Sequence, residues 1–273
     1  MPTVNDFCRM GTEIEQALNL REAPIALKIL YKNDEVSDIF IRPRRDMKKN
    51  LAFCQALTIV RHNRKSIAML KEDNWCIWPL ISFNNTPLDE NDHELLGDKH
   101  FMKDPEASKA YFKDEYPRLN TQKEVIGYTL SPLSDCSFEP DIVMIYCYPG
   151  QLRNLLMASK YETGKTAQAS LDTCASCVHA AIPVLNGDMP YNVSIPDPGD
   201  YERGLCDENY MIFTMRGDRV EEVVSGIKAL SKFGFGYRNL TMDMNFNYPR
   251  PEFYIRMFEK WGLEKGEPWG PRF

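Results

Sequence analysis

The chain has 273 residues, of which 43% are hydrophobic and 26% charged, and its formal net charge at pH 7 is −6. This composition is typical of a folded globular protein, and the length is sufficient for one large domain. The acidic balance disfavours a nucleic-acid-binding protein that relies on phosphate contacts. No apolar run is long enough to span a membrane, and the N-terminal residues lack a basic start and an apolar segment. We therefore expect a cytoplasmic protein without nucleic-acid or membrane partners.

The first half of the chain predicts two amphipathic helices separated by a strand. Apolar side chains recur at helical spacing in the first helix, which is expected over about 15 residues. A strand-like stretch follows at residues 24–31, and a basic loop at residues 42–49 precedes the second helix. The stripes of the two helices are Phe7, Met10, Ile14 and Leu18, and then Phe53, Ala56, Leu57 and Val60.

Two further apolar runs, at residues 77–83 and 142–148, have the length of strands. Between them, residues 84–124 are rich in polar and charged side chains, which indicates an insertion or a lid. The four histidines, His62, His93, His100 and His179, are scattered singly. We therefore expect them to be surface residues or hydrogen-bonded core residues rather than ligands.

The second half contains a weak internal repeat. A strand pattern from Asp141 leads through a turn into a helical pattern, and a second one from Asn209 does the same. Any two strand–turn–helix units look alike, so chance similarity is the alternative. The pattern predicts an α+β or mixed α/β fold: one compact domain over residues 1–273, with repeated strand–turn–helix units around a mixed sheet. Pro251 opens a last helix, and the aromatic tail at residues 262–273 is expected to pack on the body or on a second subunit, forming a homo-oligomer.

Eight cysteines are too few for a secreted disulfide scaffold, so they are buried apolar side chains, catalytic thiols or metal ligands. Cys174 and Cys177 form a CxxC motif directly after Asp172 and Thr173, two good N-cap residues. This order predicts that the motif lies in the first turn of a helix, where the helix dipole favours thiolate. Two such thiolates can bind one metal ion, but the motif supplies only two ligands.

Two other cysteines have surroundings that suit a shielded metal centre. Cys54 lies at the edge of an apolar helix stripe, and Cys76 lies between Trp75 and Ile77 in an apolar run. Buried structural thiols prefer the same surroundings. Spacing alone therefore leaves three interpretations open: a metal or cluster site, a dithiol redox pair, and inert thiols.

Several stretches together resemble the uncharacterised ArCR family, namely residues 21–28, 53–56, 140–145 and 192–203. The resemblance covers most of the chain, least clearly at residues 84–124. It implies a cytosolic, single-domain protein of anaerobic bacteria and archaea, and it implies no particular reaction. It also implies cysteines at positions that match Cys54, Cys76 and either Cys174 or Cys177. Some members carry a further cysteine where this chain has Pro-Asp-Pro-Gly at residues 196–199.

Our leading hypothesis is a metal-dependent redox or lyase-type protein that acts on a small molecule in anaerobic metabolism. The expected cofactor is a [4Fe–4S] cluster, because four thiolates are its usual ligands. These would be supplied by Cys54, Cys76, Cys174 and Cys177.

Three charged residues are candidate substrate contacts, and no catalytic residue is assigned. Lys28 is a charge in an apolar strand, and Asp200 and Arg203 lie at a Gly-Asp turn, where they could orient an anion. The alternative for each residue is an ordinary surface ion pair.

Two other functions remain open. The protein could be a carrier or sensor that is not an enzyme, with structural or zinc-binding cysteines. It could also be a metal-free thiol enzyme in which Cys174 attacks and Cys177 resolves, which requires an unusually acidic thiol.

Overall fold

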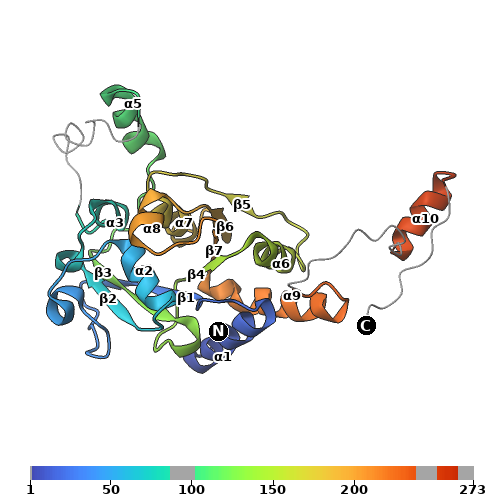
Figure 1. Cartoon of the computed structure of the whole chain (residues 1–273), viewed down its shortest axis with the longest axis horizontal. Coiled ribbons are helices and arrows are strands. Elements are labelled where there is room, and N and C mark those ends of the chain that lie inside the picture. The colour runs from blue at the N-terminus through green and yellow to red at the C-terminus, as the bar shows by residue number, and fades with distance from the viewer. Residues whose placement is uncertain (1, 87–101, 238–250, 264–273) are drawn as a thin grey trace.

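The computed structural model describes residues 2–86, 102–237 and 251–263 (Figure 1). In these residues seven strands form one sheet in the order β2-β3-β1-β4-β7-β6-β5. All neighbouring strands are antiparallel except β5 and β6, so the sheet is mixed, as predicted. The strands are β1 (Ile25–Tyr31), β2 (Ile67–Leu70), β3 (Val125–Pro132), β4 (Ile142–Cys147), β5 (Gln168–Ala169), β6 (Tyr191–Ser194) and β7 (Met211–Arg216).

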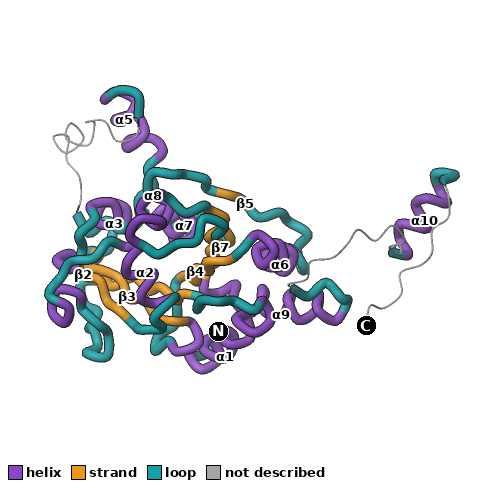
Figure 2. Tube along the Cα trace, in the orientation of Figure 1, coloured by secondary structure: helices purple, strands orange, loops and turns teal. Residues whose placement is uncertain are grey.

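Helices cover both faces of the sheet (Figure 2). One face packs against α1 (Val4–Leu18), α6 (Pro149–Ser159) and α9 (Val220–Lys232). The other face packs against α2 (Phe53–Arg61) and α7 (Ser176–Leu185), with α3 (Ile77–Ser82) and α8 (Pro198–Arg203) beside them. Of the described residues, no helix has the length and apolar character needed to cross a bilayer.

Strand β4 shows why the central strands read as unbroken apolar runs. Its alternate side chains enter two different cores, because successive residues of a strand point to opposite faces. Ile142, Met144 and Tyr146 pack toward α7, whereas Val143, Ile145 and Cys147 pack toward α1, α6 and α9. The middle of the sheet is therefore buried on both sides.

The internal repeat predicted from the sequence is present as two neighbouring strand–helix units. Strands β4 and β7 pair antiparallel, with Ile142 opposite Arg216, and α6 and α9 pack against each other. A Cβ atom on Gly226 would lie 2.6 Å from the carbonyl oxygen of Ala158. The two helices therefore make a close backbone contact that only glycine allows at this position.

The apolar run at residues 77–83 forms the short helix α3 instead of the strand that its length indicated. Pro79 accounts for the difference, since proline lacks the N–H that a strand inside a sheet would donate. The edge strand β2 comes from residues 67–70, which the hydrophobic pattern did not single out. Four residues are too few for alternation to be recognised.

The polar segment predicted as an insertion or lid, residues 84–124, falls partly outside the described residues. Its later part contains α5 (Pro105–Ala110) and η3, a π-helical turn (Tyr111–Glu115). Tyr111, Phe112, Tyr116 and Leu119 are buried in the same core as α2 and α7. This part of the segment therefore helps to build the core.

The last predicted helix is α10 (Glu252–Lys260), which begins after Pro251 and contains no buried residue. The aromatic tail expected to pack on the body or a second subunit begins at Gly262, and residues 264–273 lie outside the described residues.

Candidate functional site

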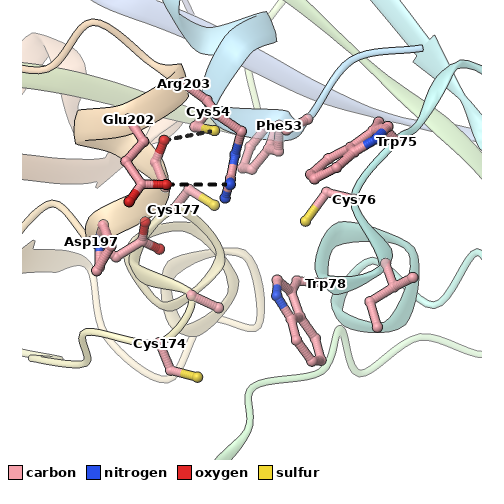
Figure 3. Close-up of a pocket in the computed structure, with 15 residues that line it drawn as sticks. Phe53, Cys54, Trp75, Cys76, Trp78, Cys174, Cys177, Asp197, Glu202 and Arg203 are labelled. Atoms are coloured by element: carbon pink, nitrogen blue, oxygen red, sulfur yellow. Dashed lines mark hydrogen bonds and ion pairs between the residues drawn. The ribbon is translucent and has the colours of Figure 1, made fainter. Parts of the chain in front are cut away.

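A pocket of about 440 Å³ opens where α2, α3, α7 and α8 begin (Figure 3). All four cysteines predicted as metal ligands, Cys54, Cys76, Cys174 and Cys177, line it. They come from three separate stretches of the chain, so the tertiary structure brings together residues whose relation is invisible in the sequence.

Cys54 and Cys76 occupy opposite sides of the pocket (Figure 3). Cys54 is the second residue of α2, and its thiol donates a hydrogen bond to the carbonyl oxygen of Gly199 in α8, 3.5 Å away. Cys76 is the N-cap residue of α3 and is partly exposed. Trp78 continues the same wall and stacks on the ring of Phe112, with 5.2 Å between ring centroids. Apolar rings therefore surround the thiols on this side.

The CxxC motif is placed differently from the prediction. Helix α7 begins at Ser176, so Cys177 is in its first turn, but Cys174 lies before the helix. The Asp172 carboxylate accepts hydrogen bonds from the backbone N–H groups of Cys174 and Ala175, at 2.7 and 3.2 Å. This local turn delays the start of the helix. The Ser176 N–H donates instead to the carboxylate of Asp197, 2.8 Å away.

The four thiols favour the protonated form, contrary to the expectation of ready-made thiolates. Burial, followed by the nearby Asp200 carboxylate, raises the pKa of Cys54 to about 12. Burial also raises the pKa of Cys174 to about 12, that of Cys177 well above 9 and that of Cys76 above 9. The cost of burying a charged thiolate thus outweighs the stabilisation that the helix dipoles provide. A metal that binds here would have to displace the thiol protons.

Two of the predicted substrate contacts lie at the pocket, at different depths. Arg203 lines the pocket and is exposed, with its guanidinium carbon 5.3 Å from the centroid of the Trp75 ring. Asp200 is buried behind the lining, where it accepts hydrogen bonds from the Tyr146 hydroxyl and the Asp197 N–H. Burial raises the pKa of Asp200 to about 7. The predicted pair therefore consists of an accessible cation and a carboxyl group that holds α8 in place.

Lys28, the third predicted contact, is not a lining residue of this pocket. It lies in β1 two residues after Ala26, whose side chain packs toward α1, and alternation directs Lys28 to that same face. The pocket is on the other face. The Lys28 charge instead acts on Asp141, whose carboxylate accepts a hydrogen bond from the Ile29 N–H at 2.7 Å.

A polar cluster beside Cys174 was missed by the sequence analysis. The Tyr111 hydroxyl lies 3.0 Å from Nε2 of His179, which is 3.6 Å from the Asp172 carboxylate. A hydrogen bond from Tyr111 also opposes the rise in the Cys174 pKa. His179 is buried and hydrogen-bonded, as the sequence analysis expected, and its place two residues after Cys177 was its only signal. Tyr111 had none, because it belongs to the segment predicted as an insertion.

Arg61 is a second residue that the sequence did not reveal. It is 1% exposed and donates hydrogen bonds to the Glu22 carboxylate and to the carbonyl oxygen of Gly204. Its guanidinium also lies over the Tyr146 ring, 4.5 Å from the centroid. These contacts join the end of α2 to the end of α8, and so fix the two helices that carry Cys54 and Arg203.

The donor set around the pocket is four sulfurs, which suits zinc and iron–sulfur centres. Four thiolates around one zinc ion lie about 3.8 Å apart, given a Zn–S distance of about 2.3 Å. In the described part of the chain, no three ligating side chains converge closely enough to hold a single ion. Among the described residues, the four thiols therefore line one pocket without forming a ready single-ion site.

The chain belongs to the uncharacterised ArCR family, whose model matches residues 13–226. The matched region runs from α1 into α9 and includes all four pocket cysteines. No curated protein and no solved structure compared with the chain matches it significantly.

Proposed function

We propose that this protein is a cytosolic redox or lyase-type enzyme whose pocket holds a [4Fe–4S] cluster. The proposed ligands are the thiolates of Cys54, Cys76, Cys174 and Cys177. One observation carries the proposal: four cysteines from three distant parts of the chain line a single pocket. Burial alone would account for an inert thiol at any one of these positions, but metal ligation also accounts for the gathering of all four.

The helix ends at the pocket support a negatively charged centre, whereas the nearby carboxylates oppose one. The N-terminal ends of α2 and α7, the two longer helices that begin here, carry partial positive charge. Phe53 and Trp78 supply apolar walls that limit the access of water. Of the described lining residues, Asp197 and Glu202 are the carboxylates that oppose a negative centre. Asp197 accepts hydrogen bonds from the backbone N–H groups of Ser176 and Asp200, and Glu202 lies 4.0 Å from the guanidinium of Arg203. The electrostatic potential at the four thiols is therefore less negative than the formal charges of the nearby side chains imply.

The second part of the proposal is the binding of a small molecule beside the cluster. When bound, a cluster held by all four thiolates would supply electrons, whereas one held by three of them would also leave one iron open as a Lewis acid. Of the described residues that line the pocket, Arg203 alone is cationic, and its planar guanidinium suits a carboxylate or phosphate group. The exposed Trp75 and Ile77 side chains beside it would contact the apolar part of the molecule. We place the reaction in anaerobic metabolism, because a cluster that a small molecule can reach can also be reached by oxygen.

The test is metal analysis of protein purified without oxygen, followed by cluster reconstitution. The proposal predicts about 4 irons and 4 sulfides per chain, together with a broad brown absorption that bleaches on reduction. Protein that remains colourless and iron-free after reconstitution would rule the cluster out. A matched Cys147→Ala variant, altered at a buried thiol outside the pocket, should reconstitute like the wild type.

The alternative proposal is a carrier or sensor that binds zinc and is not an enzyme. The same four-sulfur donor set favours it, provided that the pocket closes around one ion. About one zinc per chain, with no iron and no redox activity, would support this function. The metal-free thiol enzyme lacks support, since the pKa values of both Cys174 and Cys177 are raised rather than lowered.

A further inference from the structure

Two cysteines outside the pocket face each other on the opposite side of the sheet. Cys8 lies in α1, and Cys136 directly follows η4, a 3₁₀ turn (Leu133–Asp135). Their sulfur atoms are 3.9 Å apart, and the Cys8 thiol donates a hydrogen bond to the carbonyl oxygen of Cys136 at 3.3 Å. They are 128 positions apart in the chain. The fold therefore brings them together.

Backbone packing holds the pair at this distance. A Cβ atom on Gly11, one turn after Cys8, would lie 2.6 Å from the backbone nitrogen of Ser134 and 2.8 Å from the carbonyl carbon of Leu133. Only glycine permits this approach, so α1 rests directly on the turn that carries Cys136. The separation of the two cysteine backbones is thus set by rigid elements, and rotation of the side chains adjusts the distance between the sulfurs.

The two thiols differ in access. Cys8 is partly exposed, whereas Cys136 is buried with 4% of its surface exposed. Burial and the adjacent Cys8 also raise the pKa of Cys136 to about 12. A reagent in solution therefore reaches Cys8 first, and Cys136 is in position to react with a sulfur already modified at Cys8.

We propose that Cys8 and Cys136 form a dithiol site that low-molecular-weight disulfides oxidise to an intrachain disulfide. The Cys8 thiolate attacks the reagent disulfide, which gives a mixed disulfide at Cys8 and releases one thiol. The Cys136 sulfur, after losing its proton, attacks Cys8 Sγ and expels the second thiol. The two protein thiols are oxidised, and one reagent disulfide is reduced to two thiols.

The geometry requires only a small change. A disulfide bond is about 2.05 Å long, so the sulfurs must approach by about 2 Å, which side-chain rotation supplies. Cys147 provides a contrast, because it is fully buried and therefore out of reach of a reagent in solution. The proposal does not depend on the cluster, since the pocket lies on the other face of the sheet.

The experiment treats the full chain, purified without oxygen, with oxidised glutathione and maps the unreduced peptides by mass spectrometry. We expect a cross-linked peptide pair containing Cys8 and Cys136, absent from Cys8→Ser and retained in Cys147→Ala. In Cys136→Ala, glutathione should remain attached to Cys8. The oxidised wild type should also melt at a higher temperature than the reduced protein, because the cross-link restricts the unfolded chain.

Two outcomes would overturn the proposal. One is a wild type in which glutathione stays on Cys8 and Cys136 remains a thiol. The other is a protein in which both stay reduced while other cysteines pair. Metal content measured on the same samples reports separately on the pocket, so failure of one proposal does not imply failure of the other.

Discussion

Replacing Cys177 by alanine should remove the metal, whereas the same change at Cys147 should not. Both side chains are buried, with exposed fractions of 8% and 0%, so the loss of one sulfur should weaken packing similarly in the two variants. That common penalty is about 1 kcal/mol. Of these two residues, only Cys177 lines the pocket. Any further difference in stability or metal content between the variants therefore reports on ligation.

The size of that difference follows from the ligand count. Metal binding at structural four-ligand sites contributes on the order of 10 kcal/mol, so one of four ligands accounts for about 3 kcal/mol, or roughly a hundredfold in affinity. Because metal binding also stabilises the fold, Cys177→Ala should lose metal and melt at a lower temperature than Cys147→Ala. A chelator should lower the Tm of the wild type and of Cys147→Ala, but should not change that of Cys177→Ala.

The measurement compares iron, zinc and Tm for the two variants, both purified without oxygen and analysed with and without chelator. Wild-type metal content in both variants, together with equal Tm values, would refute ligation by Cys177. Cys147→Ala is the matched control because it changes the same residue type at the same burial on the other face of the sheet.

Three further predictions concern the free energy of unfolding. Desolvation by the surrounding chain raises the pKa of Asp141 above 3.8, although the residue is exposed at the surface, and the Lys28 charge opposes this. Ionisation of Asp141 therefore destabilises the fold as pH rises, and Lys28→Met should be more destabilising at pH 7 than at pH 3. Arg61→Met removes the guanidinium partner of the buried Glu22 and leaves it, among the described residues, only the contact with His62 Nδ1 at 3.3 Å, so it should destabilise by about 3–5 kcal/mol at pH 7. Gly226→Ala should lower the Tm despite a helix-propensity gain of about 1 kcal/mol, because the new Cβ would meet α6.

Urea denaturation and thermal melting decide these three cases. An equal loss of stability in Lys28→Met at pH 7 and at pH 3 would contradict the Lys28–Asp141 interaction. Adding Glu22→Gln to Arg61→Met should restore part of the stability, and no recovery would show that the charge left on Glu22 is not the cause. Gly226→Ala that is as stable as the wild type would contradict close packing of α6 on α9.

Much of the fold could be predicted because its elements carry strong local patterns. The α1 stripe, the β1 stretch and the two strand–helix units each have a periodicity that survives without tertiary information. The failures have local causes as well. Strand β2 is too short for its alternation to be seen, and the run that forms α3 has the length of a strand but contains Pro79. Length and apolar content alone do not distinguish a short strand from a short helix.

For the site, local surroundings selected cysteines that the fold brings to one pocket, but they described the protonation state of the thiols incorrectly. Cys54 and Cys76 were selected because apolar residues flank them, and both line the pocket. The state of the thiols was mispredicted because their pKa depends on burial by residues distant in sequence. Lys28 was misplaced because alternation defines two faces of a strand without showing which of them carries the site.

What the sequence by itself determined is therefore most of the helices and strands, the mixed sheet and four cysteines as candidate ligands. Periodicity and the identity of flanking residues are properties of short stretches of the chain, so they can be recognised without knowing the fold. The tertiary structure alone decided that the four thiols share one pocket, that Tyr111 and His179 stand beside Cys174, and that Arg61 joins α2 to α8. Each of these depends on distances between residues far apart in the chain, which are set by the packing of helices on the two faces of the sheet.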